Sequence, residues 1–76
     1  MKCKVCNNRE AEYIVSPKCS GEWQLECEEC ENDGITAGGY WIGIPDYKLR
    51  KAEWLSHLMQ KNWFDLEKFT EAVNEV

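Results

Sequence analysis

The sequence lacks the features that a membrane protein or a histidine-dependent enzyme needs. It has no apolar run near the roughly 18 residues required for a membrane span. No apolar segment follows Met1, so we expect no secretory signal. It has a single histidine, His57, so no pair of histidines is present to support acid–base catalysis. These absences favour a non-enzymatic protein of the cytoplasm.

The chain is also too short for a large hydrophobic core. It has 76 residues, of which 43% are hydrophobic, and five of that class are cysteines. A chain of this size usually needs a disulfide, a metal, a partner or very well packed helices to be stable. Every glycine, proline and cysteine precedes residue 46. This break predicts a turn-rich β half over residues 1–45 and a helical half over residues 46–76.

Positive charge is scarce as well. Nine basic residues stand against 14 acidic ones, a formal net charge of -5. Nucleic-acid binding draws on clustered cations that displace counterions from phosphates. The densest basic cluster is Lys48, Arg50 and Lys51, which we interpret as a solvated helix start. The charge balance therefore favours a protein partner over a nucleic acid.

Alternating apolar residues predict a β-hairpin in the first half. Residues 22–27 alternate, with Trp23, Leu25 and Cys27 on one face. Residues 10–15 predict the partner strand, and the turn between them covers residues 16–21. In this first strand the apolar face is predicted to hold Ala11, Tyr13 and Val15.

Residues 40–44 form an apolar, β-prone run that predicts a third strand, ended by Pro45. Turns are predicted at residues 32–34 and 38–39. Together with the hairpin, this gives a three-stranded β half.

The second half predicts two helices. The first runs from an Asp46 cap to about Asn62, and Asp65 caps the second. Phe64 and Phe69 have the spacing of a hydrophobic staple around that second cap. The first helix places its apolar residues on one wide arc: Tyr47, Ala52, Trp54, Leu55, Leu58 and Met59. Both helices are too short to be stable alone, so we expect them to pack on the third strand, with dimerisation as the rival.

Four cysteines form two C-x2-C pairs, separated by 20 residues: Cys3, Cys6, Cys27 and Cys30. This spacing is typical of a structural zinc site with four thiolate ligands and no open position. The rival interpretations are two disulfides in an exported domain, an iron site, and a thiol redox protein. We predict one structural Zn²⁺ per chain, with zinc against iron left open.

Residues 1–44 resemble a zinc ribbon, with a cysteine knuckle, a hairpin, a second knuckle and a third strand. The resemblance implies that the four knuckle cysteines are the metal ligands. The predicted fold class is therefore α+β, a small three-stranded zinc ribbon followed by two short C-terminal helices. Zinc ribbons serve transcription factors, ribosomal proteins, antitoxins and phage proteins, so the resemblance implies a fold and no activity. The cysteine-rich start followed by helices is also similar to the zinc domain of bacterial antitoxins.

Other residues offer weaker candidates for function. Cys19 lies in the predicted hairpin turn, where we expect an ordinary free thiol. His57 shares a helix face with Glu53 and Lys61, which is typical of a solvated charged face. Trp63, in the turn between the helices, is the best candidate for a partner-binding anchor, followed by Trp54.

The sequence as a whole predicts a non-enzymatic, zinc-stabilised protein-interaction or adaptor module. The alternative is a nucleic-acid-associated regulatory zinc ribbon, which the charge disfavours. A thiol redox protein ranks last, because a redox C-x2-C normally begins a helix in a thioredoxin-like unit.

Overall fold

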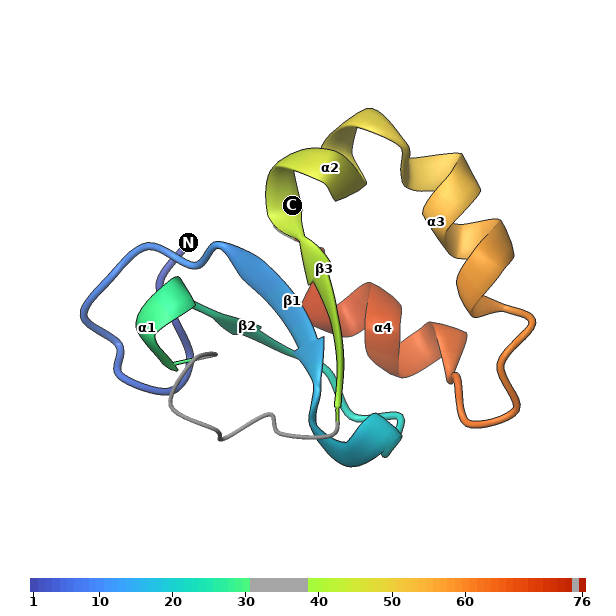
Figure 1. Ribbon diagram of the computed structural model, residues 1–76, viewed down its shortest axis with the longest axis horizontal. Helices are drawn as coiled ribbons and strands as arrows, with labels where there is room; N and C mark the ends of the chain where they lie inside the picture. Colours follow the sequence, from blue (N-terminus) through green and yellow to red (C-terminus); the bar gives the residue numbers. More distant parts are fainter. Residues whose placement is uncertain (31–38, 75) are drawn as a thin grey trace.

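A three-stranded antiparallel sheet forms the centre of the computed structural model, which describes residues 1–30, 39–74 and 76. The strands are β1 (Tyr13–Ser16), β2 (Gln24–Glu26) and β3 (Tyr40–Gly43), and they lie in the order β2-β1-β3. Helices follow the third strand along the chain (Figure 1). The fold class is therefore α+β. The predicted turns at residues 32–34 and 38 lie outside the described residues.

The predicted hairpin is confirmed. Strand β1 pairs antiparallel with β2, and Ile14 stands opposite Leu25. A short 3-10 turn, η1 (Pro17–Cys19), connects them, and its backbone is left-handed at Lys18 and Cys19. Strand β3 pairs with the other side of β1, with Ile42 opposite Ile14.

Tyr13 and Val15 share one face of β1, as predicted, but the main core lies on the other face. Ile14 contributes to the main core, whereas Tyr13 and Val15 belong to the opposite face of the sheet. Val15 and Ile14 are both fully buried, so β1 is covered on both faces. Alternation identifies the core face only where the other face is exposed, and here that condition fails.

The predicted single helix from residue 46 to residue 62 is also wrong. The chain forms two helices, α2 (Ile44–Leu49) and α3 (Lys51–Leu58), and Arg50 between them has φ -125° and ψ 41°. Helix α2 starts before Asp46, because Pro45 fits the first turn, where an N–H is not needed. As a consequence the strand ends at Gly43, and Pro45 is a helix residue.

Asp46 does not cap a helix. Its carboxylate accepts a 2.7 Å hydrogen bond from the indole N–H of Trp54 and lies 3.3 Å from the guanidinium of Arg50. The bond from Trp54 joins α2 to α3 across the bend, whereas the contact with Arg50 is a local i,i+4 pair at the end of α2. The bond from Trp54 spans eight residues, so helical periodicity does not predict it.

The second predicted cap is confirmed. Asp65 accepts hydrogen bonds from the backbone N–H groups of Glu67 and Lys68 at the start of α4 (Leu66–Ala72). The rings of Phe64 and Phe69 lie 5.4 Å apart, as the staple spacing predicts. The remaining helix, α1 (Glu28–Cys30), is a single turn that the sequence did not predict.

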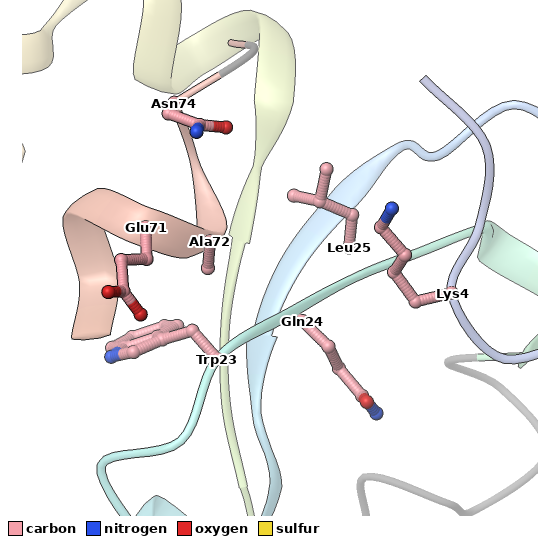
Figure 2. Close-up of a pocket in the computed structure, with 7 residues that line it drawn as sticks. All are labelled: Lys4, Trp23, Gln24, Leu25, Glu71, Ala72 and Asn74. Carbon is pink, nitrogen blue, oxygen red and sulfur yellow. The ribbon is translucent and has the colours of Figure 1, made fainter.

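One hydrophobic core lies between the sheet and helices α2, α3 and α4. Trp23 is central to it, with its ring 4.9 Å from that of Phe69. Figure 2 shows Trp23 beside Glu71 and Ala72 of α4, while Gln24 points away from the helix. The core also contains Ile14, Leu25, Ile42, Ile44, Tyr47, Leu58 and Val73. Within the described residues no helix has the length and apolar character to cross a membrane.

Candidate metal centre

The first cysteine pair lies in a tight loop at the start of the chain. The N–H of Cys3 donates to the carbonyl of Arg9, and the N–H of Asn7 donates to the carbonyl of Cys3, both at 2.9 Å. Asn7 has φ 55°, a left-handed conformation that asparagine tolerates better than most residues. A 2.8 Å bond from the N–H of Lys4 to the carbonyl of Leu25 anchors this loop to β2.

The second pair lies where β2 turns into α1. Cys27 directly follows the strand, and Cys30 ends the single helical turn. The carboxylate of Glu12 accepts from the N–H of Glu28 at 3.5 Å, at the start of that turn. The hairpin thereby returns the second pair to the first.

The four thiols form one compact cluster. Their Sγ atoms all lie within 4.8 Å of one another, and Cys6 Sγ lies 3.8 Å from Cys27 Sγ. A tetrahedron with bonds of about 2.3 Å to zinc has its sulfurs about 3.8 Å apart. Cys3, Cys27 and Cys30 are buried, and Cys6 is exposed. None of the five cysteines is joined in a disulfide. These four cysteines therefore fit a metal ion with four thiolate ligands.

The backbone around the cluster favours thiolates on the first pair. Burial acts to raise the pKa of Cys3, but N–H groups of Cys6, Cys27 and Val5 outweigh it and lower that pKa to about 6. The N–H groups of Arg9 and Asn8 likewise lower the pKa of Cys6. Burial, followed by the neighbouring thiols, raises the pKa of Cys30. A bound cation would reverse that last effect, because it stabilises the thiolate.

The other polar candidates stay outside this cluster. Cys19 lies in η1, and the four-cysteine group is the one cluster of three or more possible ligands in the described part of the chain. His57 is exposed on α3, where its ring lies 6.2 Å from that of Trp54 and 6.5 Å from that of Tyr40.

The two tryptophans predicted as partner anchors are both half-buried. The ring of Trp63 lies 5.7 Å from that of Trp23 and 5.8 Å from that of Tyr40. Trp54 is held by its hydrogen bond to Asp46. Their role in partner binding remains a prediction.

Sequence reasoning missed the most exposed tryptophan. Trp41 is 55% exposed and lies on the face of the sheet opposite the core, with its ring 5.5 Å from that of Tyr13. The apolar run over residues 40–44 suggested one continuous buried surface. Strict alternation within that run would have separated Trp41 from Ile42.

Comparison with known proteins adds no identification. No family model, no curated protein and no solved structure matches this chain. The four-cysteine cluster is therefore the main guide to its chemistry.

Proposed function

We propose that this chain is a zinc ribbon that works as a non-enzymatic protein-interaction module of the cytoplasm. The observation that carries the proposal is the cluster of four thiols from two C-x2-C pairs. Cys3, Cys6, Cys27 and Cys30 would fill all four positions of a tetrahedral Zn²⁺. A filled coordination sphere leaves no position for a substrate, which supports a structural role. Cytoplasmic thiols stay reduced, as zinc ligands must be.

The zinc would hold together the part of the chain that has least core of its own. The cysteine cluster is separate from the main hydrophobic core. Beyond the metal, the Arg9–Glu29 ion pair at 2.7 Å joins the two cysteine loops, and the Lys4–Leu25 hydrogen bond joins the first loop to β2. Exposed ion pairs contribute about 1 kcal/mol or less, so the metal would be the main crosslink.

The surface supports a protein partner. Large apolar side chains are exposed at Leu49, Met59 and Trp41, at 85%, 61% and 55%. The net charge of -5 opposes a polyanion and suits a basic or apolar partner. A nucleic-acid-associated regulatory ribbon remains the second candidate by its resemblance, although no observed surface feature favours it.

Three experiments test this function. Metal analysis of the purified chain should find one zinc per molecule. An affinity-tagged chain should retain a specific protein from its source cells, and the Cys30→Ser variant should lose it. Fluorescence anisotropy at about 0.15 M salt should show only weak binding to labelled oligonucleotides, because repulsion persists at short range. Tight, saturable oligonucleotide binding would replace this proposal with the nucleic-acid role.

A further inference from the structure

In the described part of the chain, strand β3 lies at an edge of the sheet and pairs only with β1. The N–H of Ile44 donates to the carbonyl of Glu12, which directs the backbone of residue 44 toward β1. Backbone groups alternate in direction along an antiparallel strand. Residues 42 and 40 therefore also face β1, and the N–H groups of Trp41 and Gly43 face outward, without a strand partner among the described residues.

The other edge of the sheet is arranged differently. At β2 the outward carbonyl of Leu25 accepts from the N–H of Lys4, so the first cysteine loop occupies that edge. The same alternation accounts for the arrangement of both edges. The backbone groups of Ile14 point toward β3, and those of Leu25, which stands opposite Ile14, point away from β1. Of the two edges that the described residues form, β3 is thus the one that can accept another strand.

Both sides of the β3 edge have room for side chains. On the face opposite the core, a Cβ on Gly43 would meet nothing within 4 Å. This space continues into a largely apolar hollow of about 400 Å³ at Ala11, Tyr13 and Pro45. A glycine within a strand often marks a place where another backbone approaches closely.

On the core side, an open hollow of about 280 Å³ lies between β3 and α3. Figure 1 places α3 on the side of β3 opposite to β1. Tyr40 lines the hollow from the strand, and Glu53, Trp54 and His57 line it from the helix. The ring of Tyr40 already carries a cation, because the Nζ of Lys61 lies 4.9 Å from its centroid. The carboxylate of Glu53 beside Trp54 would attract a further cationic side chain, through ion pairing and cation–π attraction.

We propose that the β3 edge binds an extended, basic segment of a partner protein, which adds a fourth strand to the sheet. Its outward backbone groups would pair with those of Trp41 and Gly43. Its side chains would alternate, so that a lysine or arginine points toward Glu53 and an apolar residue lies over Trp41 and Gly43.

Charge complementarity selects this partner over a second copy of the chain. The two hollows are lined by three carboxylates, those of Glu12, Asp46 and Glu53, against the single guanidinium of Arg50, which is paired with Asp46. Two copies of a chain with net charge -5 repel one another, whereas a basic segment is attracted. The inference rests on the proposed interaction function and specifies its surface and partner chemistry.

The test begins with selection of peptides from a random dodecapeptide display library on the zinc-loaded full chain. Enriched peptides should alternate basic and apolar residues. A labelled synthetic copy of one should shift the amide signals of Trp41 and Gly43 in ¹⁵N NMR spectra. A copy N-methylated at alternate residues should lose binding, because it cannot donate to the strand edge.

Three variants localise the binding. Gly43→Pro removes an outward N–H, Trp41→Ala removes the exposed ring, and Glu53→Lys reverses the charge. Each should weaken the peptide about tenfold or more, the typical loss at a central interface residue. Leu66→Ala is the matched control, since Leu66 is 46% exposed on α4 and lines neither hollow, and should change the affinity less than twofold.

Zinc content and dispersed NMR spectra establish that each variant is folded. If Gly43→Pro does not fold, Trp41→Ala and Glu53→Lys still test the proposal. The proposal is overturned if no peptide is enriched, or if selected peptides bind all three variants as well as the original chain. Amide shifts confined to another surface would also overturn it while leaving the interaction function intact. Failure of the tagged chain to retain any protein would instead reject the proposed function.

Discussion

Gly21 lies directly against the backbone of Trp63: a Cβ on Gly21 would come 2.8 Å from the carbonyl oxygen of Trp63. Gly21 also has φ +86°, which side-chain-bearing residues rarely adopt. The contact joins the hairpin to the loop between α3 and α4. No side chain fits between these two segments without a shift of the backbone.

We therefore predict that Gly21→Ala destabilises the zinc-loaded chain by about 2 kcal/mol or more, through left-handed strain and the close contact. Urea unfolding followed by tryptophan fluorescence measures it. Gly43→Ala is the matched control, since Gly43 has φ -68° and open space around its Cα. It should cost less than about 1 kcal/mol, the loss of a glycine helix cap. Equal losses in the two variants would contradict the role of the Trp63 contact.

Metal removal should unfold the cysteine loops. Structural zinc contributes on the order of 10 kcal/mol of apparent binding free energy, and the thiol cluster lies apart from the main core. Chelation, or Cys30→Ser, should collapse the amide dispersion of residues 1–12 and 27–30 in NMR spectra. Cys19→Ser should keep both zinc and dispersion, because Cys19 is outside the cluster. An unchanged spectrum after complete chelation would show that the fold does not depend on the metal.

Proton release on zinc binding reports whether the metal-free cysteine loops keep their folded form. In the folded loops the pKa of Cys3 is lowered to about 6, so this thiol would bind zinc at neutral pH without releasing a proton. Because metal removal should unfold the loops, and a thiol in an unfolded chain has a pKa of about 8.5, we expect close to four protons to be released at about pH 7. Titration calorimetry in buffers of different ionisation enthalpy counts the protons. Release of about three protons or fewer would show instead that the site is already folded before the metal binds.

Phe69 should be the most costly single truncation in the helical half. It is 1% exposed, and its ring lies 4.9 Å from Trp23 and 5.6 Å from Tyr47. Phe69→Ala should lower the free energy of unfolding by about 3–5 kcal/mol, through lost burial and the cavity left behind. Met59→Ala, at an exposed position, should change it by about 0.5 kcal/mol or less. Denaturant unfolding of both zinc-loaded variants provides the comparison.

Local sequence signals predicted the parts of this fold that depend on local chemistry. The Asp65 cap and the Phe64–Phe69 staple are contacts between near neighbours, and the structure confirms both. The grouping of the four cysteines was equally accessible, because paired spacing restricts how the thiols can meet.

The sequence predictions failed where contacts between different helices and strands determine the structure. The hydrogen bond from Trp54 to Asp46, eight residues apart, holds the two helices together at the bend near Arg50. The spacing of apolar residues along a helix does not predict this bond. The place of Ile14 in the core was not predicted, because Ile14 and Val15 are both buried and alternation therefore does not separate the two faces of β1. The exposure of Trp41 depends on which sheet face the helices cover, which is a tertiary property.

The hydrogen bond from Lys4 to Leu25 has a consequence for self-association. Exposed strand edges are templates for aggregation, and a sheet with two open edges can add molecules without limit. Here the first cysteine loop covers the β2 edge, so among residues 1–30, 39–74 and 76 the β3 edge is the one available for pairing. Two molecules that met edge to edge would use up that edge in both, so growth by strand pairing would stop at two. The loop that carries Cys3 and Cys6 would thus prevent fibril growth by keeping the β2 edge covered. Loss of its metal would expose that edge.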